Sequence, residues 1–421
     1  MVVNSFKNKK IVVMGLGLLG GGVGVAKFLA GQGAEVLVTD LRTRKELNPS
    51  LKKLKGLPIK YILGRHRKED FAKADLIIKN PAVPQNSPYL KIARAHKIPI
   101  KTDIEIFFDL CSGQIIGVTG TKGKSTTATL VYKFLKTKYP DTFLAGNIGK
   151  TPLEILPKLK KESKVVLELS SFELEDLKKS PPIAVITTLF PDHLNRYRSF
   201  REYIEAKKPI FKYQNKNDVL FLNRDNCETK KLSSETKSKV YFFSDGAAAE
   251  TVAKFFKIPK KDIKKVLANF KGVPNRQEFI AIKRGVRYIN DTTATTPQSV
   301  ILAIKRFLGS RIILIAGGQD KNLNYSDLAK EIKKNVSYLI LLPGTASDKI
   351  KKGLTETRSL LAGRDRVSVF TVNSMREAVR KASKLAKNGD VILLSPGAAS
   401  FNLFKNEFDR AEQFKKNVKA L

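Results

Sequence analysis

The stretch Ile115–Leu130 reads Ile-Ile-Gly-Val-Thr-Gly-Thr-Lys-Gly-Lys-Ser-Thr-Thr-Ala-Thr-Leu, and it decides the expected fold around it. A short apolar run ends in glycines, and the polar residues from Lys124 onward then open a helix-compatible segment. This order gathers backbone N–H groups and a helix N-terminus around one point, as phosphate-binding loops do. The usual spacing requires glycine where Val118 stands, so the loop is a tighter variant that runs from Gly120 to Thr126.

From these residues we predict an ATP site. Lys124 can reach the β- and γ-phosphates as a point charge, and the Ser125 hydroxyl can bind Mg²⁺. The alternative is a glycine turn between a strand and a helix, without a ligand. The residues predicted to bind ATP here are Gly120, Thr121, Lys122, Gly123, Lys124, Ser125 and Thr126.

Length and composition indicate a multidomain intracellular protein. A chain of 421 residues with 42% apolar residues is long enough for two or three domains with full cores. Its two cysteines, Cys111 and Cys227, give neither a disulfide framework nor a metal-binding spacing, so we expect a reducing cytoplasm. Glycines interrupt the apolar run Ile11–Ala26, which argues against a secretory signal, and we expect no membrane insertion.

The net charge is strongly positive. Lysine and arginine number 78 against 39 aspartate and glutamate residues, for a net charge of +39. Such a balance is compatible with nucleic-acid binding. The lysines are spread evenly, however, and no nucleic-acid motif stands out, so we favour a general lysine bias with small anionic substrates and no specific nucleic-acid partner.

The first third alternates strands with helices, which predicts a parallel α/β sheet. Glycines at Gly15, Gly17 and Gly20 follow the first strand, and Asp40 closes the second, as in dinucleotide-binding domains. The pattern predicts a nucleotide diphosphate over this loop, with the ribose or base near Asp40 and Arg42. An NAD-dependent dehydrogenase is the rival interpretation of this third alone. The expected strands are Lys10–Gly17, Ala34–Asp40, Ile59–Leu63, Asp75–Lys79 and Ile98–Thr102.

Two residues of the middle third are candidate metal ligands. Glu168 stands at the end of an apolar strand, where a carboxylate is costly unless it is paired or bound to a cation. Mg²⁺ is the expected partner, and a buried Glu–Arg pair is the alternative. His193 also follows a strand, although a lone histidine is more often structural than a ligand. The expected strands are Lys164–Leu169, Ile183–Leu189, Asp218–Asn223 and Lys239–Phe243.

The last third resumes the alternation after Lys271–Arg276. Polar groups collect in the loops Asp291–Gln298, Gly317–Asn322 and Ser395–Asn402, each at a strand end. A terminal helix over Asn402–Leu421 is expected to dock through Phe404, Phe408 and Val418. The expected strands are Val286–Asn290, Arg311–Ala316, Tyr338–Leu342, Val367–Thr371 and Asp390–Leu394.

Several ordered motifs together resemble a known family, the Mur ligases of peptidoglycan synthesis, with folylpolyglutamate synthase as a relative. The likeness runs nearly end to end and is strongest to the branch that adds D-glutamate. The motifs are Gly15-Leu16-Gly17-Leu18, Gly146-Asn147-Ile148-Gly149, Val166 to Glu175, Asp192-His193-Leu194-Asn195-Arg196-Tyr197, Gly272-Val273-Pro274-Asn275-Arg276 and Leu394 to Phe401 with Phe404-Lys405-Asn406.

The resemblance implies three α/β domains. They are a Rossmann-like UDP-binding domain (1–112), a central P-loop ATPase-type domain with a mostly parallel sheet (113–274), and a Rossmann-like C-terminal domain that binds D-glutamate (275–421). It also implies a cytoplasmic, monomeric ligase. The enzyme would use ATP to join D-glutamate to UDP-N-acetylmuramoyl-L-alanine through an acyl phosphate, in peptidoglycan precursor synthesis.

The resemblance also assigns the catalytic residues. Lys124 would hold the γ-phosphate, Ser125 and Glu168 would hold one Mg²⁺, and His193 would bind a second Mg²⁺ near the acyl phosphate. Lys207 matches a lysine that the family carbamylates with CO₂, which turns an ammonium into an anion that orients a metal. A plain surface lysine is the alternative, because Lys208 stands next to it.

The remaining assignments concern the substrates. Arg276 and Asp291 match residues that approach ATP, and Thr295, Lys321 and Ser400 match those that take the carboxylates of D-glutamate. In this family the first glycine loop holds UDP instead of NAD. The residues expected to bind the UDP-linked substrate are Gly17, Leu18, Leu19, Asp40, Arg42, Asn147 and Ser170.

The sequence departs from the family pattern at four places. Thr293 replaces a lysine, Glu173 replaces a common glutamine, and Leu19 replaces a common threonine. The segment between Phe243 and Phe255 is shorter than usual, so the central domain is trimmed near its ATP contact. A ligase of the same family that adds another amino acid is one competing hypothesis. A non-catalytic descendant that binds polyanions is the other, suggested by the net charge of +39 and by the trimmed central domain.

Overall fold

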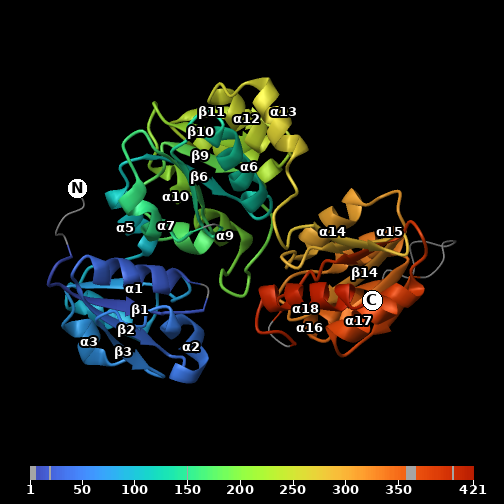
Figure 1. Cartoon of the computed structure of the whole chain (residues 1–421), viewed down its shortest axis with the longest axis horizontal. Coiled ribbons are helices and arrows are strands. Elements are labelled where there is room, and N and C mark those ends of the chain that lie inside the picture. The colour runs from blue at the N-terminus through green and yellow to red at the C-terminus, as the bar shows by residue number, and fades with distance from the viewer. Residues whose placement is uncertain (1–5, 19, 149, 357–366, 401–402) are drawn as a thin grey trace. The chain divides into compact units, whose positions relative to one another are not determined.

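The computed structural model describes residues 6–18, 20–148, 150–356, 367–400 and 403–421. The chain divides into two compact units, Met1–Leu189 with Ile204–Ala268 and Phe190–Tyr203 with Asn269–Leu421. The first unit contains two sheets and the second contains one (Figure 1). The expected α/β fold with three sheet-containing domains is therefore confirmed, whereas the exact limits of the domains stay a prediction.

The N-terminal sheet has five parallel strands in the order β3-β2-β1-β4-β5. The central strand β1 buries Ile11 to Met14, as a parallel sheet covered by helices requires. The strands are β1 (Lys10–Met14), β2 (Glu35–Asp40), β3 (Ile59–Leu63), β4 (Leu76–Lys79) and β5 (Ile100–Lys101). The helices are α1 (Gly21–Gly31), α2 (Arg44–Lys52), α3 (Lys68–Ala72), α4 (Pro88–Ala95) and α5 (Asp103–Leu110).

The start of α1 packs against the preceding glycine loop. A Cβ atom placed on Gly22 would lie 2.4 Å from the carbonyl oxygen of Leu16, so only glycine permits this approach. The loop therefore lies directly over the helix N-terminus, in the arrangement expected of a diphosphate site.

The central sheet has six parallel strands in the order β11-β10-β9-β6-β8-β7. The edge strand β7 was not among the expected strands; it is a short run that includes Gly146. The strands are β6 (Gln114–Thr119), β7 (Thr142–Gly146), β8 (Lys164–Glu168), β9 (Ile183–Ile186), β10 (Val219–Asn223) and β11 (Lys239–Phe243). The helices are α6 (Lys124–Lys136), α7 (Pro152–Ile155), η1 (Leu156–Lys158), α8 (Ser171–Leu174), α9 (Phe200–Glu205), α10 (Pro209–Lys212), α11 (Cys227–Lys231), η2 (Leu232–Glu235), α12 (Ala248–Phe255) and α13 (Lys260–Ala268).

The C-terminal sheet has the order β12-β13-β17-β14-β15-β16, with β12 antiparallel to β13 and the other pairs parallel. The edge strand β12 was not expected, because its residues alternate only weakly between buried and exposed. The strands are β12 (Glu278–Lys283), β13 (Val286–Asn290), β14 (Ile312–Gly317), β15 (Tyr338–Leu342), β16 (Ser368–Thr371) and β17 (Val391–Leu394). The helices are α14 (Pro297–Arg306), α15 (Ser326–Asn335), α16 (Thr345–Glu356), α17 (Met375–Leu385) and α18 (Glu407–Lys419).

The terminal helix differs from its prediction. It starts at Glu407, because the Asn406 side chain accepts a hydrogen bond from the backbone N–H of Asp409 and caps it. Phe404 and Val418 are buried as expected, but Phe408 is 47% exposed and its prediction as a docking residue was wrong. Phe414 is the buried aromatic residue of this helix, and the predicted first residue, Asn402, lies outside the described residues.

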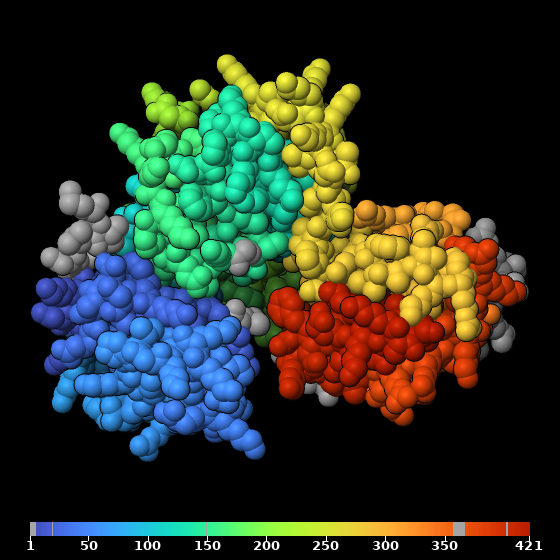
Figure 2. Space-filling view, viewed as in Figure 1, coloured from blue at the N-terminus to red at the C-terminus, as the bar shows by residue number. Residues whose placement is uncertain are grey.

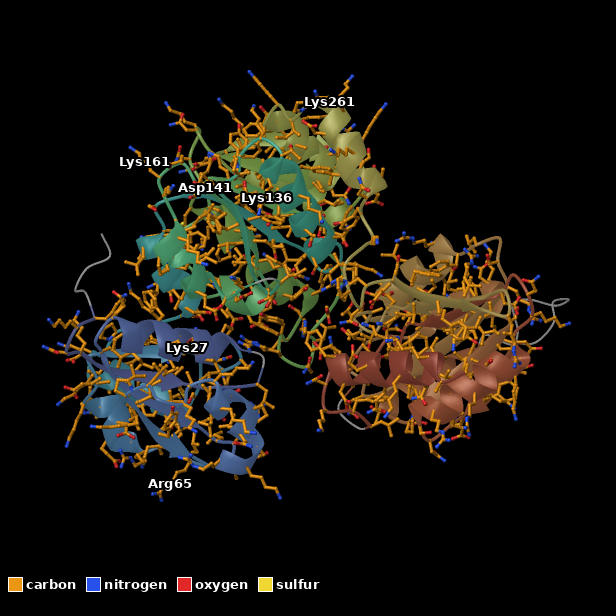
Figure 3. All side chains as sticks on the ribbon, viewed as in Figure 1. Lys27, Arg65, Lys136, Asp141, Lys161 and Lys261 are labelled. Carbon is orange, nitrogen blue, oxygen red and sulfur yellow. The ribbon has the colours of Figure 1, made fainter. Side chains whose placement is uncertain are left out.

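The basic residues are exposed in the central domain as well as the N-terminal one. Lys136 of α6, Lys261 of α13 and Lys161 of the turn before β8 are exposed residues of the central domain (Figure 3). Side chains of the yellow segment, which contains α12 and α13, project from the surface as separate protrusions (Figure 2). Among the described residues, no helix combines the length and apolarity needed to cross a bilayer.

Candidate active site

The phosphate loop joins β6 to α6 and is braced by the neighbouring strand end. The Thr187 and Thr188 hydroxyls donate to the carbonyl oxygen of Lys122 at 2.6 and 3.0 Å, and the Thr121 N–H donates to the carbonyl oxygen of Thr188. Gly120 has a φ of 145°, and a Cβ there would lie 2.0 Å from the Thr187 hydroxyl oxygen. These contacts therefore hold the loop in this conformation without a ligand.

Lys124 begins α6 and folds back over the loop. Its Nζ donates to the carbonyl oxygens of Gly120 and Thr121, both at 3.0 Å. The ammonium is thus held beside the helix N-terminus, where N–H groups and the helix dipole favour an anion. Ser125, the next residue, is 2% exposed, and Thr126 is partly buried.

Glu168 lies at the carboxyl end of β8, directly beside Val118 of β6. It is 2% exposed, and its Oε2 atom has no hydrogen-bond partner among the described residues. A buried acceptor without a partner is costly, and a bound cation would satisfy it. The described residues contain no group of three or more His, Cys, Asp or Glu side chains arranged to hold a metal ion. The single buried carboxylate of Glu168 fits the ligand preference of Mg²⁺, which usually takes one or two carboxylates together with phosphates and water.

Lys207 and Lys208 occupy different environments. Lys207 is 2% exposed, and its Nζ donates to the carbonyl oxygen of Gly120 at 3.1 Å, as Lys124 also does. Lys208 instead forms ion pairs with Glu205 and Glu235 at 2.6 and 2.5 Å. Two ammonium groups therefore converge on one loop carbonyl, which concentrates positive charge at the phosphate loop.

In the first glycine loop, Asp40 binds the backbone. Its carboxylate oxygens accept from the N–H groups of Gly17 and Arg42 at 3.0 and 2.9 Å. The Ser50 hydroxyl donates to the carbonyl oxygen of Gly17 at 2.7 Å. Asp40 is 6% exposed and so shapes the loop, while Leu18 is exposed and Leu19 lies outside the described residues.

Asn147 and Ser170 lie at the same sheet edge as Glu168. The Asn147 N–H donates to the carbonyl oxygen of Glu168 at 3.1 Å. The Ser170 hydroxyl donates to a carboxylate oxygen of Glu173 at 2.6 Å and accepts from the Glu173 N–H, so the two residues form a capping box at the start of α8. Burial, together with the nearby charges of Asp103 and Glu168, raises the pKa of Glu173 to about 7 although the hydrogen bonds with Ser170 oppose the rise.

The second unit brings two of the predicted D-glutamate residues together. Lys321 Nζ donates to the Thr295 hydroxyl at 2.9 Å and to Asp192 Oδ1 at 3.2 Å. Asp192 is 7% exposed; burial raises its pKa, but Lys321 and His193 more than offset this, so the pKa stays below its usual value. Sequence reasoning gave Asp192 no role, although its place beside His193 was a signal.

His193 has a backbone φ of 55°, and its N–H donates to Asp192 Oδ1 at 2.7 Å. Its ring nitrogen Nε2 lies 3.5 Å from Asp192 Oδ2. Ser400 is 4% exposed at the end of the loop that follows β17. This loop after β17 is joined to the loop after β14, because Gln319 and Ala399 exchange backbone hydrogen bonds at 2.9 Å.

The loop after β13 contains Asp291 and the atypical Thr293. Asp291 accepts from the Gln277 N–H at 3.1 Å and from the Ser395 hydroxyl at 3.3 Å. The Thr293 hydroxyl donates to the carbonyl oxygen of Asn275 at 3.0 Å, so it fixes the loop where the family has a lysine. Arg276, the neighbour of Asn275, is partly exposed.

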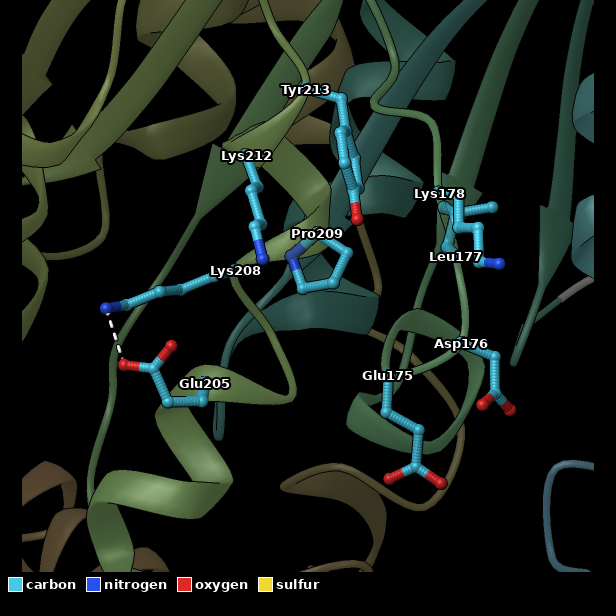
Figure 4. Close-up of a pocket in the computed structure, with 9 residues that line it drawn as sticks. All are labelled: Glu175, Asp176, Leu177, Lys178, Glu205, Lys208, Pro209, Lys212 and Tyr213. Carbon is cyan, nitrogen blue, oxygen red and sulfur yellow. Dashed lines mark hydrogen bonds and ion pairs between the residues drawn. The ribbon is translucent and has the colours of Figure 1, made fainter. Parts of the chain in front are cut away.

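A recess of about 350 Å³ lies between the segment after α8 and the α9–α10 region (Figure 4). None of its lining residues is a predicted site residue. Within its lining Lys208 pairs with Glu205, and Asp176 pairs with Lys79 of the N-terminal sheet, outside the lining, at 2.6 Å. The recess therefore gives no reason to move the predicted site. It is lined by Glu175, Asp176, Leu177, Lys178, Glu205, Lys208, Pro209, Lys212 and Tyr213.

Three family models match the chain in order. They are "Mur ligase MurD-like, N-terminal domain" over residues 9–102, "Mur ligase middle domain" over 118–282 and "Mur ligase, glutamate ligase domain" over 275–397. A UDP-N-acetylmuramoylalanine–D-glutamate ligase of Roseiflexus sp. (strain RS-1) is 40% identical, over 98% of both chains. A protein of the same name from Borreliella afzelii (strain PKo) is 38% identical over the full length of both.

Solved structures share the fold. The UDP-N-acetylmuramate–alanine ligase MurC of Thermotoga maritima has a TM-score of 0.63 at 19% identity, covering 98% of this chain and 100% of that one. The MurF ligase of Thermotoga maritima in complex with ADP has a TM-score of 0.60 at 18% identity, covering 100% and 97%. Fold and phosphate loop together define the class, an α/β protein built on three sheets with a nucleotide phosphate loop. Within that class, the chain belongs to the Mur ligase family.

Proposed function

We propose that this protein uses ATP to join D-glutamate to UDP-N-acetylmuramoyl-L-alanine, in the synthesis of peptidoglycan precursors. Its full-length relatives carry the name of that activity. The observation that supports the acceptor is the placement of the Lys321 ammonium beside the Thr295 hydroxyl, since a cation with a hydroxyl donor suits a carboxylate. Ser400 completes the proposed set of residues for the two carboxylates.

The proposed reaction has two steps. The γ-phosphoryl group passes from ATP to the alanyl carboxylate, which gives an acyl phosphate and ADP. The amine of D-glutamate then attacks the acyl carbon, inorganic phosphate leaves, and an amide forms. Phosphoryl transfer depends mainly on positioning and charge stabilisation, which the phosphate loop and Lys124 are placed to supply.

We assign Mg²⁺ to Ser125 and Glu168, because the buried Glu168 oxygen lacks another partner among the described residues. When bound, Mg²⁺ would neutralise phosphate charge. Lys207 is assigned as the carbamylated lysine because it, and not Lys208, is buried at the phosphate loop. Carbamylation would form a bond between Nζ and the carbon of CO₂ and release two protons, one as the ammonium becomes an amine and one as the N–C bond forms. One of two neighbouring cations would thereby become an anion.

The other assignments remain part of the proposal. We assign the UDP-linked substrate to Gly17, Leu18, Asp40, Arg42, Asn147 and Ser170, and we expect Arg276 and Asp291 to contact ATP. A second Mg²⁺ at His193, a monomeric state and a cytoplasmic location also remain predictions. They rest on the family resemblance and on the sequence composition.

The test is phosphate release by the purified protein with Mg-ATP and UDP-N-acetylmuramoyl-L-alanine. D-glutamate, L-glutamate, L-lysine and meso-diaminopimelate are added in turn, and Lys124→Ala is the control for the phosphate loop. We expect release with D-glutamate alone, and none from Lys124→Ala. Release with another amino acid would keep a ligase but reject the acceptor, and Mg-ATP binding without release would favour a non-catalytic descendant.

A further inference from the structure

Arg410 is the largest fully buried side chain among the described residues. It lies in the first turn of α18 and is 0% exposed. Sequence reasoning treated this segment only as a docking helix. A buried guanidinium in the first turn has no advantage for the helix itself, because the positive end of the helix dipole disfavours a cation there.

The guanidinium binds two loops of the second unit. Its Nε donates to the Thr292 hydroxyl at 2.9 Å and its Nη2 to the Thr292 carbonyl oxygen at 2.7 Å. Its Nη1 donates to the carbonyl oxygen of Ala398 at 3.2 Å. The Thr292 hydroxyl in turn donates to the carbonyl oxygen of Glu407 at 3.1 Å. One side chain therefore joins α18 to the loop after β13 and to the loop after β17.

Both loops carry residues of the proposed D-glutamate site. Thr295 follows Ala294, whose carbonyl oxygen accepts from the Gly397 N–H at 2.8 Å. Ser400 follows Ala399, which exchanges hydrogen bonds with Gln319 in the loop of Lys321. Arg410 is thus the buried centre of a network that fixes all three loops relative to one another.

The electrostatics argue against a role in stability alone. Among the described residues no carboxylate forms an ion pair with Arg410. Burial lowers the pKa of Arg410 to about 10, although the charge of Glu407 opposes the shift, so the group is still charged at neutral pH. A buried charge without an ionic partner is unfavourable compared with an apolar side chain of similar volume.

We propose that Arg410 is a positioning residue for the amino-acid substrate. Its planar guanidinium group holds the loops of Thr295, Lys321 and Ser400 in the geometry that binds this substrate. The proposal rests on the proposed function for the identity of that substrate. The guanidinium group has several N–H donors in fixed directions, and the ammonium of lysine cannot reproduce this arrangement.

The experiment compares Arg410→Met, Arg410→Lys and Thr292→Val with the wild-type protein. The matched control is Arg311→Met. Arg311 makes a similar set of hydrogen bonds, to Asp390 and to the carbonyl oxygen of Leu385, but at the opposite ends of the strands. The measurements are kcat, the KM values for D-glutamate and ATP, and hydrogen exchange at the amides of Ala294, Gly397 and Ala399.

We expect Arg410→Met to raise the KM for D-glutamate by about 10- to 100-fold, as misplaced substrate-binding groups do, with the KM for ATP within about twofold. Exchange at the three amides should accelerate in Arg410→Met and hardly change in Arg311→Met. Arg410→Lys should not restore the KM. Thr292→Val removes the hydroxyl but keeps the carbonyl acceptor, so it should change the KM for D-glutamate and the exchange rates in the same direction by a smaller factor. This variant serves as the test if Arg410→Met does not fold.

Three results would overturn the proposal: an unchanged KM for D-glutamate, identical kinetics in Arg410→Met and Arg311→Met, or full recovery in Arg410→Lys. If the wild-type protein shows no turnover with D-glutamate, the proposed function fails instead. The exchange rates then still decide whether Arg410 fixes the loops.

Discussion

The ammonium of Lys321 lies 3.2 Å from Oδ1 of Asp192 in a nearly buried ion pair. The same Nζ donates to the Thr295 hydroxyl at 2.9 Å, so two of its three N–H donors have protein partners. The third donor is the one that we assign to a substrate carboxylate. Asp192 therefore orients the cation that we assign to D-glutamate.

The substitution Lys321→Met should damage both binding and stability. It removes the Lys321 cation and leaves the buried Asp192 carboxylate with the His193 ring beside it but without its lysine partner, which we expect to destabilise the protein by roughly 3 kcal/mol at neutral pH. Adding Asp192→Asn should recover part of that loss but not the KM for D-glutamate. Urea denaturation and steady-state kinetics of the single and double variants test this, and equal stability of Lys321→Met and the double variant would reject the coupling.

Acid should weaken the same ion pair. The pKa of Asp192 lies below its usual value in the folded protein, so its contribution to stability is present above the unfolded pKa and is lost as the pH falls through the folded pKa. The wild-type protein should therefore lose stability below about pH 4 more steeply than Asp192→Asn. Denaturation midpoints measured at pH 7 and at pH 3 provide the comparison.

Lys207 and Lys208 form a matched pair of test positions. Lys207→Ala removes a buried Nζ at the phosphate loop and should reduce kcat by about 100-fold or more, whereas Lys208→Ala should stay within about twofold. The measurement is ATP-dependent phosphate release with each variant at saturating substrates. If Lys208→Ala were the more damaging change, the assignment of the carbamylated lysine would have to shift by one position.

The sequence predicted most of the sheets because buried parallel strands appear as short apolar, β-branched runs between glycines and polar helices. It missed β7 (Thr142–Gly146) and β12 (Glu278–Lys283), both of which are edge strands. Edge strands contact the core on fewer sides, so their sequences are under weaker apolar constraint. Several predicted strands also ended earlier; β9, for example, stops at Ile186.

The candidate site residues that lie in recognisable sequence motifs could be predicted from the sequence. The hydrogen bonds that hold those residues in place could not. Asp192, Thr187 and Arg410 act through hydrogen bonds to groups that are distant in the chain, and no local pattern encodes such partners. Phe408 shows the converse error, because its spacing suited an apolar stripe although the helix starts late and turns it toward solvent.

Glu168→Gln should weaken the response to Mg²⁺. The change removes the negative charge at the end of β8 while it preserves the size of the side chain, so the Mg²⁺ concentration for half-maximal activity should rise by about 10-fold or more. Titration of activity with MgCl₂ at fixed ATP measures this concentration, and EDTA should abolish turnover in the wild-type protein. An unchanged Mg²⁺ response in Glu168→Gln would reject the assignment.

Glu173→Gln should change how stability depends on pH. In the folded protein the pKa of Glu173 is raised from the ordinary glutamate value of 4.5 to about 7, chiefly by burial and by the charge of Asp103. Between these two pH values the folded state therefore keeps a proton on Glu173 that the unfolded state releases. The contribution of this proton to stability is fully present below pH 4.5 and is lost as the pH rises through about 7.

The glutamine variant carries no titrating group at this position, and its amide oxygen can still accept from Ser170, so the capping box at the start of α8 should survive. We expect Glu173→Gln to be more stable than the wild-type protein at pH 8, by on the order of 2 kcal/mol, and about equal to it at pH 4.5. Urea denaturation at the two pH values measures the difference, with Glu175→Gln as the control on the more exposed neighbour. A constant difference between wild type and Glu173→Gln across this range would show that the Glu173 carboxyl does not titrate there.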